Sequence, residues 1–181
     1  AGFHLGEVDH DGDGKTDLIC TGNEGGVVVN INTTAAGSNE PSFESIQIHS
    51  SSHLVSFIDF DGDGKLETLV RPSQIFKDLK EKALKSGIHM GTWTVADFNS
   101  DGWPDLFAAG IQSRRSYWSG PRKLYRNNKG VLEEAATDSA LVTGYIGGIA
   151  KSADFNNDGH FDIYIFSSTN IEEDKTERIT Y

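Results

Sequence analysis

Short runs of alternating hydrophobic and polar residues recur along the whole chain, and they lie on either side of loops rich in acids and glycine. The runs are dominated by Val, Ile, Phe and Thr, a composition that favours β-strands. Runs before an acidic loop cover residues 3–8, 54–58, 92–96 and 149–153, and runs after one cover 18–21, 66–70, 106–109 and 163–166. Each pair of runs is predicted to form a β-hairpin.

Further strands follow these hairpins. In the first unit they are expected at 27–31 and 43–48, and in the third at 123–126 and near 131–135. Four short antiparallel strands, repeated every 40 to 60 residues along this sequence, are typical of a β-propeller. The predicted fold class is therefore all-β, with propeller blades of four strands joined by acidic hairpin loops.

The second unit departs from this pattern. Segment 74–86 has hydrophobic residues at helical spacing, at 75, 76, 79 and 83, so a short helix or a turn is expected there. No clear third strand precedes it, which suggests a trimmed blade or missing residues near 71–74.

The whole chain is predicted to be one repeat array, residues 1–181, with approximate blades at 1–50, 51–88, 89–145 and 146–181. The last blade is incomplete, so the array amounts to about three and a half blades. Propellers close with 4–8 blades, and an open sheet edge invites further pairing. We therefore expect the remaining blades to come from the same or another chain.

Four nine-residue windows align without gaps as Asp-x-Asp/Asn-x-Asp-Gly-x-x-Asp/Glu, at residues 9–17, 59–67, 97–105 and 154–162. Positions 1, 3, 5 and 9 offer side-chain oxygens, and position 7 can offer its backbone carbonyl. Position 6 is always Gly, which turns sharply at positive φ without steric cost. The predicted metal ligands are Asp9, Asp11, Asp13, Lys15, Asp17, Asp59, Asp61, Asp63, Lys65, Glu67, Asp97, Asn99, Asp101, Trp103, Asp105, Asp154, Asn156, Asp158, His160 and Asp162.

Oxygen-only donor sets of this kind suit a hard cation, and Ca²⁺ accepts 6–8 oxygens in flexible geometry. Up to four Ca²⁺ ions are therefore expected. An EF-hand is rejected because its position 12 needs a bidentate Glu, whereas Cys20, Val70, Ala108 and Ile165 stand there. Transition metals are disfavoured because the loops lack Cys, and Mg²⁺ is the weaker candidate because it prefers a tighter octahedron.

Net charge is −11, and fourteen carboxylates lie within the four loops. Four Ca²⁺ ions would reduce the charge to −3, since −11 + 8 = −3. The acidity argues against a nucleic-acid partner. No apolar run is long enough for a transmembrane segment, and the first residues do not form a signal peptide, so a mature or excised fragment is expected. The single cysteine, Cys20, is expected to be a buried structural thiol.

The motif Asp-Phe-Asn-x-Asp-Gly-x-x-Asp, as at 97–105 and 154–162, resembles FG-GAP and VCBS repeats, which form the propeller of integrin α chains and of many extracellular proteins. The stretch 124–130, Leu-Tyr-Arg-Asn-Asn-Lys-Gly, looks like VCBS units in particular. The resemblance covers nearly the whole chain, although His10 replaces the Phe of the other loops. It implies Ca²⁺ in hairpin loops on one face and an extracellular, cell-surface or secretory-pathway setting.

Two classes of function are expected. The first is a calcium-stabilised module that binds a protein or glycan ligand in adhesion, without catalytic residues. The alternative is the propeller portion of a carbohydrate-active enzyme such as a polysaccharide lyase, because fold alone does not decide function. Segment 112–122 is the favoured contact surface, and Asn32-Thr33-Thr34 is a glycosylation sequon. Further polar candidates are His4, His53, His89, Arg114, Arg115, Tyr117 and Trp118.

Overall fold

Four antiparallel sheets make up the described part of the chain, and we call them blades 1 to 4. The computed structural model describes residues 4–21, 26–48, 55–70, 74–76, 85–86, 92–109, 122–135, 148–167 and 175–179. It divides into two compact units, Ala1–Gly87 and Ile88–Tyr181, and each unit contains two blades. These residues are all-β, which confirms the predicted fold class.

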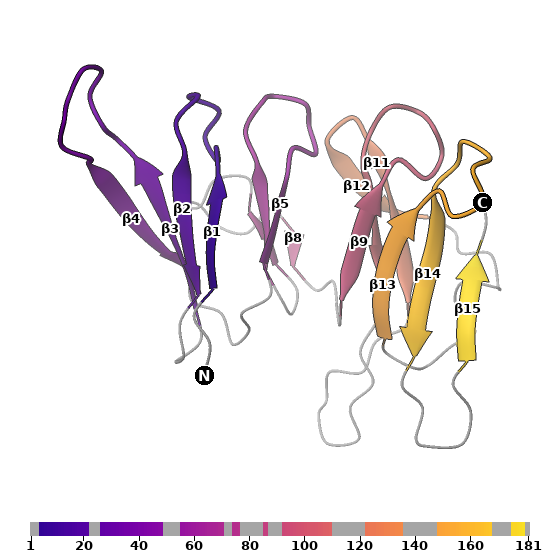
Figure 1. Cartoon of the computed structure of the whole chain (residues 1–181). Coiled ribbons are helices and arrows are strands. Elements are labelled where there is room, and N and C mark those ends of the chain that lie inside the picture. The colour runs from indigo at the N-terminus through magenta and orange to yellow at the C-terminus, as the bar shows by residue number, and fades with distance from the viewer. Residues whose placement is uncertain are drawn as a thin grey trace. The chain divides into compact units, whose positions relative to one another are not determined.

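Every blade is a meander in which strands that are consecutive in sequence are neighbours in the sheet (Figure 1). Blade 1 consists of β1 (His4–Val8), β2 (Asp17–Thr21), β3 (Val27–Asn32) and β4 (Phe43–Ile48). Blade 2 consists of β5 (Val55–Ile58), β6 (Glu67–Val70), β7 (Gln74–Phe76) and β8 (Lys85–Ser86). Blade 3 consists of β9 (Trp93–Ala96), β10 (Asp105–Ala108), β11 (Lys123–Asn128) and β12 (Val131–Glu134). Blade 4 consists of β13 (Gly148–Ala153), β14 (Asp162–Ser167) and β15 (Lys175–Ile179).

Blade 2 has four strands, which corrects the expectation of a short helix or turn over 74–86. β7 pairs with β6, so that Ile75 lies opposite Leu69, and β8 pairs with β7, so that Lys85 lies opposite Ile75. Both ends of the segment are therefore strands, while residues 77–84 lie outside the described residues. The spacing of a few apolar residues does not distinguish helix from strand, and pairing with β6 decides the outcome at 74–76.

Within each unit, the two blades pack face to face around a hydrophobic core. In the first unit, Ile19, Val27 and Val29 of blade 1 are buried against Val55 and Phe57 of blade 2. Burying side chains of this size contributes roughly 1.5–3 kcal/mol each. The packing holds the β1–β2 and β5–β6 hairpins at the same end of the unit (Figure 1).

The second unit repeats this arrangement with larger side chains. Phe98, Phe107 and Leu124 of blade 3 form one buried cluster with Ile163 and Ile165 of blade 4. Ala96, Ala109 and Ala150 complete the cluster. Thr94 Oγ1 and Ser152 Oγ also form a hydrogen bond of 2.7 Å across the two blades. No helix among the described residues is long and apolar enough to span a bilayer.

Candidate metal-binding loops

The four acidic windows are the turns of the hairpins β1–β2, β5–β6, β9–β10 and β13–β14, and we call them loops 1 to 4. In each loop, two residues have a left-handed backbone conformation with positive φ. Position 6 does so as predicted, with Gly14 at φ 83° and its counterparts at 84°, 91° and 87°. Position 4 does so as well, at Gly12, Gly62, Ser100 and Asn157, with φ between 58° and 73°. The sequence signal for position 4 is this set of small or amide residues, which tolerate such a φ.

Backbone N–H groups orient the carboxylates of each loop in the same way. The carboxylate at position 1 accepts a hydrogen bond from the Gly at position 6, as from Gly14 to Asp9 Oδ2 at 2.9 Å. The corresponding distances in loops 2, 3 and 4 are 3.0, 2.8 and 2.9 Å. The carboxylate at position 5 accepts from the N–H of position 7 in every loop, at 2.8 or 2.9 Å. The donor oxygens are therefore positioned by the backbone itself.

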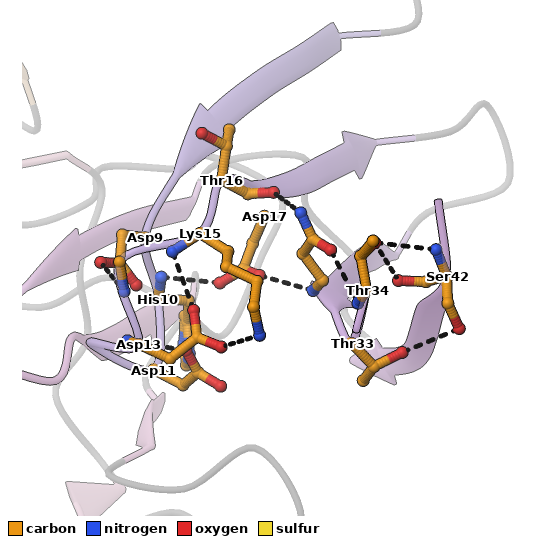
Figure 2. Close-up of polar contacts among 12 residues, drawn as sticks. Asp9, His10, Asp11, Asp13, Lys15, Thr16, Asp17, Thr33, Thr34 and Ser42 are labelled. Atoms are coloured by element: carbon orange, nitrogen blue, oxygen red, sulfur yellow. Dashed lines mark hydrogen bonds and ion pairs between the residues drawn. The ribbon is translucent and has the colours of Figure 1, made fainter. Parts of the chain in front are cut away.

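In loop 1 the side chains of Asp9, Asp11 and Asp13 each place one carboxylate oxygen within 4.8 Å of the others. Figure 2 shows these three side chains together at the tip of the hairpin. In loop 2 the group that meets this distance is Asp59, Asp61 and Glu67, which are positions 1, 3 and 9 rather than 1, 3 and 5. Close carboxylates repel one another, and a hard divalent cation that prefers oxygen ligands relieves that repulsion. The donor chemistry of both loops fits Ca²⁺.

Loop 1 also contains its own cation. Lys15 Nζ donates to Asp13 Oδ2 at 2.6 Å, in an exposed ion pair (Figure 2). The hydrogen bond from the Lys15 side chain lowers the pKa of Asp13, and the same bond raises the pKa of Lys15. A metal ion bound by Asp13 would therefore compete with the Lys15 ammonium for this carboxylate.

At position 3, loops 3 and 4 have an asparagine, whereas loops 1 and 2 have an aspartate. Asn99 Nδ2 donates to Asp101 Oδ2 at 2.8 Å, and Asn156 Nδ2 donates to Asp158 Oδ2 at 2.6 Å. In both loops the amide oxygen accepts the N–H of position 5, at 3.0 and 2.9 Å. Each of these loops therefore offers one negative charge fewer than loops 1 and 2, with a similar backbone.

The carboxylate at position 9 differs from the other acids because it is buried in all four loops. In loop 3, Asp105 Oδ2 accepts the Phe98 N–H at 3.2 Å and Oδ1 accepts the Asn127 N–H at 2.8 Å. In loop 1, Asp17 accepts the N–H groups of His10 and Asn32 at 2.8 and 2.7 Å. Burial raises the pKa of Asp105, and the hydrogen bonds from the N–H groups of Asn127 and Phe98 lower it in part. In loops 1 and 3, position 9 thus joins the loop to the third strand of its blade.

Two asparagines that the motif does not include complete this connection. Asn32 Nδ2 donates to the Thr16 carbonyl at 3.1 Å, and Asn127 Nδ2 donates to the Pro104 carbonyl at 3.0 Å. Thr16 and Pro104 both occupy position 8 of their loops. The matching roles favour a structural interpretation of Asn32 over a glycan acceptor in the sequon. The sequence signal that could have identified Asn32 and Asn127 is the repetition of Asn near the end of the third strand of blades 1 and 3.

Neighbouring loops within a unit are in direct contact. In the first unit, the Leu66 N–H donates to the His10 carbonyl at 3.0 Å, and His10 Nε2 lies 2.9 Å from Thr68 Oγ1. The His10 ring also meets Phe57 edge-on at a centroid distance of 5.6 Å. Position 2 of loop 1, where the other loops have Phe, therefore contacts blade 2 through both polar and aromatic groups.

Replacement of Gly12 by Ala is expected to destabilise the first unit by about 3 kcal/mol, of which the positive φ contributes roughly 1–2 kcal/mol. A Cβ on Gly12 would lie 2.5 Å from the Gly64 carbonyl oxygen, so loops 1 and 2 would have to separate. Gly14→Ala is the matched control, because its φ is also positive while its Cβ would meet nothing within 4 Å. Urea denaturation measures both variants, and equal losses would contradict a steric contact between the loops.

Several candidates from the sequence cannot be placed. His53, His89, Arg114, Arg115, Tyr117 and Trp118 lie outside the described residues, as does segment 112–121. His4 begins β1. Cys20 is half-buried rather than buried, because it lies on the face of blade 1 that is turned away from blade 2. Its Sγ lies 3.7 Å from Asn30 Nδ2.

Comparison with known families supports the repeat structure. A family model described as FG-GAP-like repeat matches residues 9–70 and 78–165, which together make up most of the chain. The first stretch contains loops 1 and 2, and the second contains loops 3 and 4. A search of curated proteins returned no significant match.

Proposed function

Because the chain belongs to the FG-GAP-like repeat family, we propose that it is an extracellular binding module whose propeller blades are stabilised by up to four Ca²⁺ ions. The proposal starts from the family and from the all-β fold of propeller-type blades. The observation that carries the proposal is the repeated loop geometry, in which backbone N–H groups hold the acids at positions 1 and 5 in the same way in all four loops.

The ion at each loop would be held by side-chain oxygens at positions 1, 3, 5 and 9 and by the carbonyl of position 7. Bound there, Ca²⁺ supplies positive charge and cross-links the two strands of the hairpin. The number of charged ligands tunes calcium affinity. Loops 1 and 2, with four acids each, therefore bind more tightly than loops 3 and 4, with three acids each.

An extracellular setting follows from the same chemistry. A site with a dissociation constant of about 10⁻⁵ M stays mostly empty at the low free calcium concentration inside cells and fills at the roughly millimolar calcium outside them. Such sites are filled only where calcium is abundant. FG-GAP-like repeats are typical of extracellular proteins, which agrees with this requirement.

The ligand is proposed to be a protein or a glycan that contacts segment 112–122 through the residues before Arg122, which is itself buried. Arg, Tyr and Trp, which this segment contains, are the residues that most often anchor interfaces. The test is a glycan array and an extracellular-protein array, each probed in Ca²⁺ and in excess chelator. Calcium-dependent binding that Trp118→Ala reduces by about tenfold or more, as for an interface anchor, is the expected result.

The control is Trp103→Phe, because Trp103 contributes its backbone carbonyl rather than its side chain to loop 3. Binding that survives neither substitution would indicate general misfolding, whereas binding that survives both would contradict segment 112–122 as the contact surface. Turnover of a polysaccharide in the same screen would favour the alternative, a propeller that belongs to a carbohydrate-active enzyme.

A further inference from the structure

Every Asp-Gly step of this chain lies within one of the four loops. These steps begin at Asp11, Asp13, Asp61, Asp63, Asp101 and Asp158. At Asp-Gly an aspartate cyclises most readily onto the peptide nitrogen that follows it, because Gly has no side chain to hinder the approach. Opening of the cyclic imide then gives isoaspartate. Each step is therefore a candidate site for this conversion, and the loop geometry decides among them.

Hydrogen bonds donated by the Gly N–H groups separate the candidates. The Gly at position 6 donates to the carboxylate at position 1 in every loop, at distances from 2.8 to 3.0 Å. At position 4 of loop 2, the Gly62 N–H donates to Asp59 Oδ1 at 2.7 Å. Among the described residues, the Gly12 N–H has no acceptor. Gly12 is therefore the one Gly of these steps whose nitrogen is not held by its loop.

The Asp11 side chain is folded back over Gly12. The Asp13 N–H donates to Asp11 Oδ1 at 3.2 Å, and Gly12 is the residue between them. Asp9, Asp11 and Asp13 each place one oxygen within 4.8 Å of the others (Figure 2). Cyclisation removes the charge of Asp11, so repulsion within this group favours it when no cation is bound. A bound cation instead stabilises the ionised carboxylate.

We propose that Asp11–Gly12 is the peptide at which the metal-free chain converts to isoaspartate, and that Ca²⁺ in loop 1 blocks this conversion. The Gly12 nitrogen forms a bond to Cγ of Asp11, and one carboxyl oxygen leaves as water with the amide proton and one proton from solvent. Water then opens the imide at the main-chain carbonyl, and the new carboxylate returns the proton to solvent. The choice of site depends on loop geometry alone, whereas the block by Ca²⁺ rests on the proposed function.

Conversion would change loop 1 in two ways. The main chain gains a methylene at Asp11, and the carboxylate becomes attached directly to Cα, so position 3 no longer presents its oxygen to the ion. Gly12 also lies against loop 2, where an added Cβ would be 2.5 Å from the Gly64 carbonyl oxygen. A longer main chain at this point would disturb that contact. The converted chain is therefore expected to lose one calcium site.

The test is peptide mapping of the full chain after prolonged incubation in excess chelator and, in parallel, in Ca²⁺. Mass spectrometry with electron-based fragmentation distinguishes isoaspartate from aspartate at each Asp-Gly step. In chelator, conversion at Asp11 is expected to exceed that at every other step by about fivefold or more, which is the protection that one hydrogen bond provides. In Ca²⁺, conversion at Asp11 should fall to the level of the other steps.

Asp11→Glu keeps the carboxylate but cyclises far more slowly through a larger ring, so it should abolish the signal at residue 11. Asp61→Glu is the matched control, because it makes the same change at position 3 of loop 2 and should leave conversion at Asp11 unchanged. Conversion that is spread evenly over the Asp-Gly steps, greatest at another step, or absent in chelator overturns the site.

The unfolding midpoint of each sample separates failure of this proposal from failure of the calcium sites. Conversion at Asp11 that continues unchanged in Ca²⁺, in a sample whose midpoint Ca²⁺ has raised, overturns the block by Ca²⁺. A midpoint that Ca²⁺ does not change means that the proposed function itself has failed, and the chelator sample then decides the site by itself.

Discussion

Addition of Ca²⁺ is expected to raise the thermal unfolding midpoint of this chain by about 20 °C or more over its value in excess chelator. A site with a dissociation constant of about 10⁻⁵ M, at about 1 mM Ca²⁺, contributes about 2.7 kcal/mol to stability. Four such sites would add roughly 11 kcal/mol, which is comparable to the whole stability of a domain. For a chain of this length, each kcal/mol moves the midpoint by roughly 2–4 °C.

The physical reason is the concentration of like charge in the loops. Fourteen carboxylates lie within the four windows, and Asp9, Asp11 and Asp13 bring their oxygens within 4.8 Å. Mg²⁺ alone is the control, because it retains its water ligands and requires a tighter octahedron, so it should give a much smaller shift. A midpoint that is the same in Ca²⁺ and in chelator would remove the calcium proposal.

Loss of the buried carboxylate of loop 3 is expected to destabilise the chain even without calcium. Asp105→Ala removes the acceptor for the N–H groups of Phe98 and Asn127, both of which are buried. Hydrogen bonds to a charged group contribute roughly 1.5–3 kcal/mol each. The burial that raises the pKa of Asp105 offsets part of this, so the expected loss is about 3 kcal/mol, measured by urea denaturation in excess chelator.

Asp101→Ala in the same loop provides the comparison. Its carboxylate is exposed, so water can replace it as the partner of the Trp103 N–H. In chelator this variant should lose less than about 1 kcal/mol, and it should show its defect only when Ca²⁺ is present. A loss from Asp105→Ala in chelator that is no larger than the loss from Asp101→Ala would contradict a special structural role for the buried carboxylate at position 9.

Much of the fold could be predicted from the sequence because hairpins and metal loops are local features. The alternation of apolar residues gave the strands on both sides of each loop to within one or two residues. The four aligned windows predicted one hairpin each, and one window lies between the first two strands of each described sheet. The assignment of the twenty predicted metal ligands stays a prediction, although the loop geometry agrees with it.

Features that depend on neighbouring segments could not be predicted in this way. The helical spacing over 74–86 is local, whereas its outcome at 74–76 depends on pairing with β6. Cys20 stands in an apolar run, but its burial depends on what covers its face of blade 1. The role of Asn32 depends on Thr16, which is 16 residues away in sequence and adjacent only in the folded sheet.

The close approach of Gly12 to the Gly64 carbonyl has a consequence for how calcium binds. Loops 1 and 2 contain eight carboxylates in two turns that touch, so the charge of one loop acts on the affinity of the other. While one loop is empty its negative charge attracts an ion to the other, and neutralising it reduces that attraction. Contact between the turns also means that ordering one turn prepares the other, which has the opposite sign. The two ions are therefore thermodynamically linked, and the measured coupling reports which of the two effects is larger.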